Sequence, residues 1–273
     1  MSVTISSLSN YIGRKAIVTL YSPTGNTIPY TNATQINLGL QILPFDYTAL
    51  DTINEYGHFS VLFTGYNHTC VVKQQTPEDG DGNKYNVIKI GTQTWMSENL
   101  RTTKYQDGTP LSNLSEVNNS SWINATSSNK YWAYVNGSPL NTETYGLLYN
   151  QYAVTGSTIG SSPSNNLCPV GYHVPTNAEF STLNTFLGVN AGTQMKSNSL
   201  WDSGGSGTNT SGFNGVPSGY RDIFSGNYVS FSIFESFWST NATKDWRLYY
   251  FNSLFNTDTS NVRYGFSVRC LKN

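Results

Sequence analysis

Histidines are the residues of this chain best suited to metal binding and acid–base chemistry, and there are three: His58, His68 and His173. A zinc site needs three or four His, Cys, Asp or Glu ligands that converge in space. The sequence contains no His-x-x-x-His pair and no Cys-x-x-Cys pair. His173 lies between Cys168 and a helix-capping motif, where a hydrogen-bonded structural histidine is the better interpretation. We therefore expect no metal site.

Nucleophilic and glycosidic catalysis have no stronger support. A Ser–His–acid triad can be drawn by chance from any chain this rich in serine, and no Gly-x-Ser-x-Gly elbow strengthens one. Glycoside hydrolysis needs two carboxylates that face each other. Glu98, Glu179 and Glu235 each have a simple local role instead. We expect no catalytic residue, no enzyme activity and no cofactor.

A partial calcium-loop pattern lies at Asp79, Asp81 and Asn83, which have the spacing of the first three ligands. The sixth and twelfth positions of such a loop require Gly and Glu. Here they are Lys84 and Ile90. A hairpin turn explains this segment better than a calcium site.

The segment Trp246–Tyr264 is the strongest candidate for ligand binding. Its middle consists almost entirely of Tyr, Phe, Asn, Ser, Thr and Asp. Tyr supplies rigid amphipathic contact area, and Asn and Ser supply adaptable hydrogen bonds, as in antibody paratopes. A plain β-hairpin with a polar tip at Asn256–Asn261 would explain the composition equally well. The ligand-binding residues that we expect are Tyr228, Phe231, Trp246, Tyr249, Asn252, Phe255, Asn256, Asp258, Asn261 and Tyr264.

Composition limits the classes of partner. The chain has 273 residues, of which 37% are hydrophobic, 14% aromatic and 11% charged, and its net charge is −1. The absence of a basic run argues against nucleic-acid binding. No apolar run is long enough to span a membrane, so we expect no membrane partner. The first residues, Met1–Leu8, lack the cationic and apolar pattern of a secretory signal.

Residues 1–75 are predicted to form an all-β, Ig-like sandwich. Residues 35–43 alternate strictly between apolar and polar, and two strands are expected over 58–64 and 68–73, separated by a Gly65–Asn67 turn. A sandwich of this size buries little core, so association would stabilise it. We expect a homo-oligomer, with a trimer slightly favoured, or docking of residues 1–75 to a larger assembly.

Residues 76–83 form a polar linker rich in Pro and Gly, and residues 84–273 form a second domain. An opening hairpin is expected over 85–96, and two helices over 145–154 and 176–187. For the second helix, Thr176 and Glu179 have the spacing of a capping box. Its expected apolar stripe consists of Phe180, Leu183, Phe186 and Leu187.

Several sequence blocks of the second domain resemble the Fibrobacter succinogenes major paralogous domain, a family with a C-type-lectin-like fold. They occur in order across nearly all of residues 84–273: Ile90–Leu100, Lys104–Pro110, Tyr145–Asn150, Cys168–Thr176 and Gly265–Cys270. The resemblance implies an α+β chain in which the Ig-like sandwich precedes a lectin-like domain with two helices. It implies ligand-presenting loops rather than catalysis. The Glu-Pro-Asn and Gln-Pro-Asp triplets of calcium-dependent lectins are absent.

The resemblance has two further consequences. Cys168 and Cys270 both fall in matching blocks, so they form either a disulfide across the domain or two reduced, buried thiols. Some relatives are variable proteins of diversity-generating retroelements, in which codons of a C-terminal segment are rewritten. Adenine-directed rewriting of Asn codons would leave the residue types of Tyr249–Tyr264, with Gly265–Cys270 as the invariant frame strand.

The expected function is that of a non-enzymatic protein on a virion surface, such as a phage fibre or a capsid decoration. The family is common in gut bacteria and their phages. The lectin-like domain would bind a host cell-surface glycan or protein. The alternatives are a bacterial cell-surface adhesin or secreted binding protein, and an accessory domain of a carbohydrate-active enzyme. The start at Met1 without a signal favours the virion, in which residues 1–75 would dock to other virion proteins.

Overall fold

The computed structural model describes residues 60–62, 69–71, 76–113, 118–202 and 204–273. The chain divides into two units between Gln75 and Thr76, and each unit is considered by itself. In the first unit, β1 (Ser60–Leu62) and β2 (Thr69–Val71) form an antiparallel pair. These strands lie within the two predicted over 58–64 and 68–73. The rest of the predicted sandwich, with His58 and His68, lies outside the described residues.

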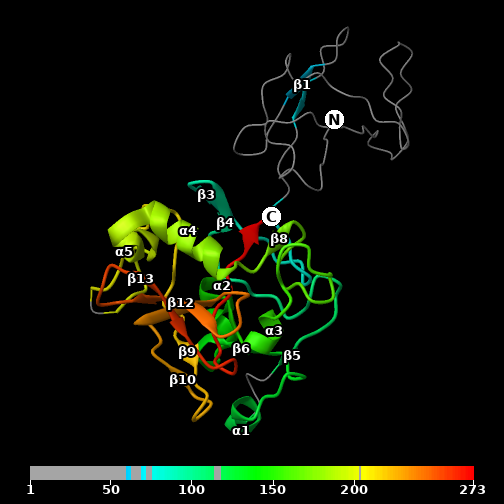
Figure 1. Cartoon of the computed structure of the whole chain (residues 1–273), viewed down its shortest axis with the longest axis vertical. Helices are drawn as coiled ribbons and strands as arrows, with labels where there is room; N and C mark the ends of the chain where they lie inside the picture. The colour runs from blue at the N-terminus through cyan, green and yellow to red at the C-terminus, as the bar shows by residue number, and fades with distance from the viewer. Residues whose placement is uncertain (1–59, 63–68, 72–75, 114–117, 203) are drawn as a thin grey trace. The chain divides into compact units, whose positions relative to one another are not determined.

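The second unit has an α+β architecture, in which short helices accompany several small sheets (Figure 1). One sheet has the order β3-β4-β14-β8 and is antiparallel throughout. A second, β5-β6-β7, pairs β5 parallel to β6, and the remaining sheets are the antiparallel β9-β10 and β11-β12-β13. The strands are β3 (Val87–Ile90), β4 (Gln93–Met96), β5 (Ser112–Asn113), β6 (Tyr131–Tyr134), β7 (Leu147–Tyr149), β8 (Tyr172–His173), β9 (Tyr220–Arg221), β10 (Tyr228–Val229), β11 (Phe234–Trp238), β12 (Lys244–Tyr249), β13 (Phe255–Thr259) and β14 (Leu271–Lys272).

The described helices are short except for α4. They are α1 (Asn119–Ile123), α2 (Thr142–Tyr145), α3 (Gln151–Val154), α4 (Asn177–Leu187) and α5 (Ala191–Met195), with 3₁₀ turns η2 (Val135–Gly137), η3 (Pro139–Asn141) and η4 (Gly188–Asn190). Among the described residues, none of these helices has the length and apolar character needed to cross a membrane.

The predicted opening hairpin is confirmed, because β3 and β4 pair with Ile90 opposite Gln93. The turn before it is also a hairpin turn, closed by an antiparallel bridge between Glu78 and Lys84. The Asp79 carboxylate accepts hydrogen bonds from the backbone amides of Asp81 at 2.9 Å and Asn83 at 3.0 Å. This carboxylate therefore shapes the turn from within.

Helix α4 begins as predicted. The Thr176 hydroxyl accepts from the Glu179 amide at 3.3 Å, and the Glu179 carboxylate accepts from the Thr176 amide at 2.7 Å, which completes the capping box. Phe180 and Leu183 are buried, whereas Phe186 is 63% exposed and does not belong to the core-facing stripe.

The helix predicted over 145–154 is wrong, and so is the count of two helices. The segment is divided into the end of α2, strand β7 and helix α3. Gly146 has a φ of 74°, and a side chain there would meet the Cβ of Asn99 at 2.6 Å. The glycine therefore ends α2, and pairing of β7 with β6 takes priority over helical periodicity.

The C-terminal segment closes the domain. Strand β14 lies between β4 and β8, with Leu271 opposite both Trp95 and His173. Cys168 and Cys270 form a disulfide with Cα atoms 5.9 Å apart and 102 residues apart in sequence. Of the two alternatives left open by the sequence, the structure contains the disulfide.

Residues 265–270 are buried but do not form the regular strand that the sequence predicts. Gly265, Phe266 and Ser267 make single bridges to three different partners, Arg221, Tyr149 and Phe237. A side chain at Gly265 would lie 2.8 Å from both Arg221 and Trp122. The segment is therefore an extended stretch of chain that passes through the core and contacts several sheets. Only its continuation, β14, pairs with neighbouring strands as part of a sheet.

Candidate ligand-binding site

The site is built on one face of the β11-β12-β13 sheet. Side chains of a strand alternate between the two faces of its sheet. In β12 and β13, Trp246, Leu248 and Phe255 point into the core that contains Phe180 of α4. Arg247, Tyr249, Asn256 and Asp258 are the alternating residues and occupy the opposite face. Figure 1 shows α4 and α5 on one side of this sheet and β9 and β10 on the other.

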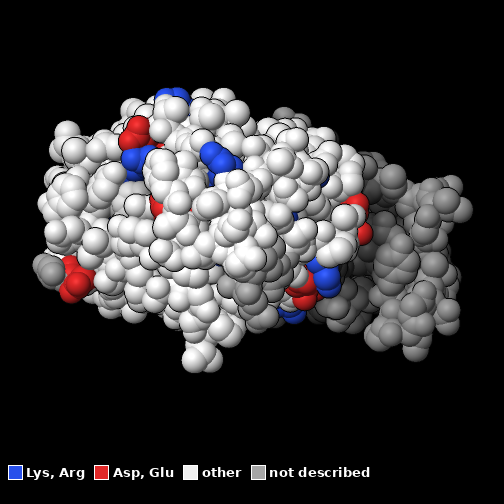
Figure 2. Space-filling model, turned by 90° about the horizontal axis from the view of Figure 1, so that it is seen from below, with Lys and Arg blue, Asp and Glu red and all other residues white. Residues whose placement is uncertain are grey.

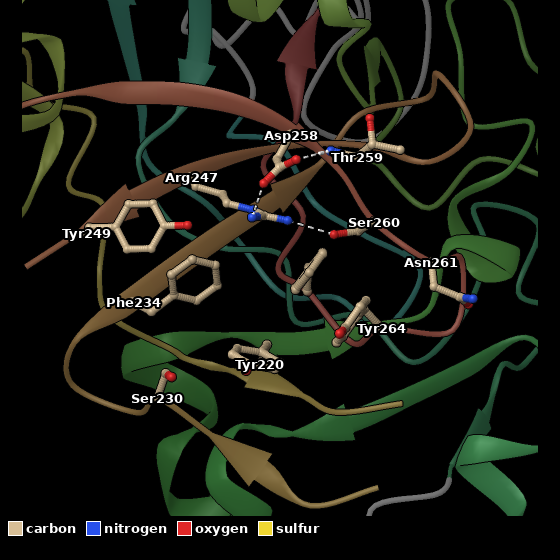
Figure 3. Close-up of a pocket in the computed structure, with 11 residues that line it drawn as sticks. Tyr220, Ser230, Phe234, Arg247, Tyr249, Asp258, Thr259, Ser260, Asn261 and Tyr264 are labelled. Atoms are coloured by element: carbon tan, nitrogen blue, oxygen red, sulfur yellow. Dashed lines mark hydrogen bonds and ion pairs between the residues drawn. The ribbon is translucent and has the colours of Figure 1, made fainter. Parts of the chain in front are cut away.

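A pocket of about 380 Å³ lies on the face opposite α4. Tyr249 and Phe234 form one side, Tyr264 lies across from them, Tyr220 lies below and Arg247 and Asp258 lie above (Figure 3). The complete lining is Tyr220, Ser230, Phe234, Arg247, Tyr249, Asp258, Thr259, Ser260, Asn261, Tyr264 and Phe266. The lining thus combines aromatic rings and small neutral polar groups with one ion pair, Arg247–Asp258.

The aromatic rings of the pocket support one another. The ring centroids of Tyr220 lie 5.5 Å from Phe234 and 5.7 Å from Tyr264, both in edge-on geometry. Tyr264 stacks on the buried ring of Phe266 at 5.4 Å. Such pairs hold each ring in one orientation. The pocket wall is therefore pre-organised.

Arg247 is held in a network of ion pairs. Its Nε lies 2.6 Å from the buried Asp245 carboxylate, its Nη2 donates to Ser260 Oγ at 2.8 Å, and its Nη1 pairs with Asp258. Burial acts against the charge, but the hydrogen bond and charge of Asp245 outweigh it, so the pKa of Arg247 is raised. The guanidinium is therefore a fixed, always charged part of the wall.

Burial also raises the pKa of the Tyr220 and Tyr264 phenols, with a smaller contribution from Asp222. Both phenols therefore remain neutral at physiological pH. They can act as hydrogen-bond donors or acceptors toward a ligand.

Lys196 holds the loop that follows β12, residues 250–254. The Nζ of Lys196 donates to the carbonyl oxygens of Tyr249 at 3.0 Å and Asn252 at 2.9 Å. Lys196 is itself buried, and its ammonium lies 5.3 Å from the centroid of the Trp201 ring. The polypeptide that carries Tyr249 out of the sheet therefore has a defined path.

Four of the predicted ligand-binding residues line this pocket, namely Tyr249, Asp258, Asn261 and Tyr264. Asn256 is exposed on the same face of the sheet. Asn252 is half-buried, and its side chain accepts from the Leu254 amide, so it shapes the loop. The predicted residues that do line the pocket therefore lie at alternate positions of β12 and β13 and in the segment that follows β13.

Four other predicted binding residues lie outside the pocket. Trp246 and Phe255 are 4% and 1% exposed and belong to the core, because they occupy the α4-facing positions of their strands. Tyr228 and Phe231 pack elsewhere, Tyr228 beside Trp122 and Phe231 against Tyr145 at 5.0 Å. The alternative of a plain β-hairpin agrees with the antiparallel pairing of β12 and β13, but its tip lies between Tyr249 and Phe255 and not at 256–261.

Sequence reasoning missed much of the lining. Arg247 could have been found from the alternation of Trp246 and Leu248 with polar neighbours. Tyr220 and Phe234 come from β9 and β11 and have no local signal that would place them beside β13. Only the pairing of the strands brings them to the pocket.

The acids and histidine considered for catalysis have structural partners. His173 is buried, with Nδ1 2.7 Å from Asn273 Oδ1 and Nε2 3.0 Å from Glu179 Oε1. Glu98 pairs with Arg101 at 3.0 Å. Glu235 accepts from Asn99 Nδ2 at 2.9 Å inside the core. Within the part of the chain that the structure describes, no three His, Cys, Asp or Glu side chains are placed to hold a metal ion.

A family model described as Fibrobacter succinogenes major domain matches residues 88–272. The chain belongs to this family. In this Fibrobacter succinogenes major domain, the matched range contains every residue of the pocket lining and both disulfide cysteines. The resemblance recognised in the sequence blocks is thereby confirmed. Nothing among the curated proteins or the solved structures matches the chain.

Charged side chains are sparse on the face of the molecule shown in Figure 2, where a few of each sign lie at scattered points. This agrees with a chain in which only 11% of residues are charged. A partner that contacts this face of the Fibrobacter succinogenes major domain would therefore meet mainly uncharged side chains.

Proposed function

We propose that this protein is a non-enzymatic binding protein of a virion surface, whose C-terminal domain has a C-type-lectin-like fold and binds a ligand on the host cell. The observation that carries the proposal is the pocket between β9, β12, β13 and residues 260–266. Its rings and neutral polar groups form a mostly pre-organised, concave surface, as ligand sites do. Its lining contains no His or Cys, and its single carboxylate, Asp258, is paired with Arg247.

Composition supports binding over catalysis. Three tyrosines in the lining provide contact area with little loss of side-chain entropy, and Ser, Thr and Asn provide hydrogen bonds. The host ligand would be a surface glycan or protein. Residues 1–75 would serve for docking to the particle or for formation of an Ig-like homotrimer, and light scattering on the full chain would test the association.

The experiment measures binding of the fluorescently labelled full chain to a panel of gut bacterial isolates. We expect binding to at least one isolate, reduced about tenfold or more by Tyr249→Ala combined with Asp258→Asn, since several interface contacts are lost together. Tyr152→Ala is the matched control, because this half-buried tyrosine lies on α3 and is not part of the pocket lining.

Equal loss of binding in the pocket variant and in Tyr152→Ala would contradict the proposed site. Thermal unfolding of each variant separates loss of contact from loss of fold. The pocket variant should unfold within a few degrees of the unchanged chain, because both residues are partly exposed.

A further inference from the structure

The pocket lining contains one cationic side chain, Arg247, but its charge is already neutralised. The guanidinium contacts Asp245 through Nε at 2.6 Å and through Nη2 at 3.4 Å, and it pairs with Asp258 through Nη1. One positive charge against two negative charges leaves a formal charge of −1 at this place. An anionic ligand would have to displace a carboxylate that holds the guanidinium in place, so the site disfavours anions.

An organic cation is also disfavoured. Cations bind over the faces of aromatic rings, but the Arg247 guanidinium already lies 6.0 Å from the centroid of the Phe234 ring. A ligand ammonium would have to compete with the Arg247 guanidinium for the Asp258 carboxylate and for the ring of Phe234. The pocket is therefore suited to an uncharged ligand.

The remaining groups of the pocket match a polyhydroxylated ring. Asp258 accepts from Arg247 and from the Thr259 amide, and a carboxylate has about four acceptor positions, so two remain for hydroxyl groups. The phenols of Tyr220, Tyr249 and Tyr264 and the side chain of Asn261 can donate or accept. A sugar ring presents hydroxyls at its edge and C–H groups on its faces, and the aromatic walls can cover those faces.

A row of rings continues from the pocket to the open surface. Phe234 and Tyr249 have ring centroids 5.1 Å apart, and Tyr249 and Phe251 are 5.2 Å apart. Phe251 is 66% exposed and does not belong to the lining of the pocket. Phe251 is therefore placed to contact a part of the ligand that extends beyond the pocket.

The position of Phe251 is fixed by its loop. Lys196 binds the carbonyl oxygens on both sides of Phe251, at Tyr249 and Asn252. The backbone of Tyr250 lies so close to Gly205 that a side chain at Gly205 would meet it at 2.7 Å. Because the backbone of this loop is already held in place, binding of a ligand to Phe251 carries a smaller ordering cost.

We infer that the pocket and Phe251 form a two-part site for an uncharged oligosaccharide. One sugar unit occupies the pocket beside Tyr249 and Asp258, and the next unit packs on Phe251. This inference rests on the proposed function, because it names the ligand class of the same pocket. A protein ligand is the competing class that the experiment must exclude.

The test uses the full chain on an array of monosaccharides, uncharged di- to tetrasaccharides and their sialylated or sulfated counterparts. Oligomers of N-acetylglucosamine are uncharged, and their deacetylated forms have the same backbone but are cationic, so this pair isolates the effect of ligand charge. We expect binding of uncharged chains, at least tenfold weaker binding of the charged counterparts, and loss of cell binding after periodate oxidation of cell-surface glycans. Preference for an anionic or cationic glycan, or cell binding that resists periodate, would overturn the inference.

Phe251→Ala tests the second part of the site. We expect roughly 3- to 10-fold weaker binding of an uncharged trisaccharide and unchanged binding of the monosaccharide. Phe186→Ala is the matched control, since Phe186 is 63% exposed on α4. If Phe251→Ala behaves like Phe186→Ala while Tyr249→Ala abolishes binding, the two-part site is wrong and the proposed function stands. If Tyr249→Ala also has no effect, the proposed function fails as well.

Discussion

Replacing Glu235 with glutamine should change how the stability of the C-terminal domain depends on pH. Glu235 lies on β11 and is completely buried. Its carboxylate accepts hydrogen bonds from Asn99 Nδ2 and from the Ser218 amide, both at 2.9 Å. Asn99 in turn accepts from Nε of the buried Arg269 at 3.1 Å. The carboxyl group is thus bonded inside the core, away from water.

The magnitude follows from the pKa of this carboxyl. Burial raises the pKa of Glu235 from 4.5 to about 7, although hydrogen bonds from Ser218 and the charge of Arg269 oppose the shift. Between these two values the unfolded chain has released the proton and the folded chain has kept it. The contribution of the Glu235 carboxyl to the free energy of unfolding is therefore fully present below pH 4.5. It falls by about 3 kcal/mol in total as the pH rises to 7. Glutamine does not titrate, so the variant lacks this slope.

The assay is urea unfolding of the full chain at several pH values between 4.5 and 7.5. Tryptophan fluorescence reports on the second unit, because all six tryptophans of the chain lie there. The difference in unfolding free energy between Glu235→Gln and the unchanged protein should move by about 3 kcal/mol in favour of the variant across this range. Glu179, whose pKa is lowered by its His173 and Thr176 contacts despite burial, gives an opposite slope that cancels in the difference.

A pH-independent offset added to this change would reflect the altered hydrogen bonds of the glutamine and is compatible with the reasoning. Parallel pH profiles would refute it, because they would mean that the Glu235 carboxyl has the same proton affinity in the folded and unfolded chains. Glu143→Gln is the control, since its side chain is 81% exposed and should leave the profile unchanged.

Lys196→Met should lower the stability of the domain by about 2–3 kcal/mol, because the carbonyls of Tyr249 and Asn252 lose a charged donor, and it should also weaken glycan binding. Urea unfolding and array binding measure the two effects, and unchanged binding in a destabilised variant would show that the loop does not need this lysine. Reduction of the disulfide, or Cys168→Ser with Cys270→Ser, should cost up to about 4–5 kcal/mol, because the bond closes a loop of 102 residues. An unfolding temperature that is the same with and without reductant would contradict this expectation.

Local signals in the sequence were sufficient for several elements. The capping box at Thr176 and Glu179 lies within four consecutive residues, so the start of α4 could be predicted without a tertiary contact. The hairpin β3-β4 is also local, since its strands are joined by a two-residue turn. Family membership likewise followed from short blocks in the correct order.

The segment 145–154 shows where local signals end. Its apolar spacing is compatible with a helix, and the decision for a strand depends on two contacts that are distant in the sequence. Gly146 packs against Asn99, and β7 pairs with β6. Tertiary pairing outweighs the small helix propensity of a short segment.

The sequence alone determined that Trp246–Tyr264 is rich in aromatic and amide side chains, which is why this segment was a candidate for binding. Only the tertiary structure decided which of those side chains face a ligand. Phe180 of α4 covers one face of β12 and β13, so Trp246 and Phe255 are buried. Tyr220 and Phe234, from β9 and β11, complete the pocket on the other face. Alternation along a strand divides its side chains between two faces, but the elements that pack from elsewhere in the chain determine which face becomes core and which remains open to a ligand.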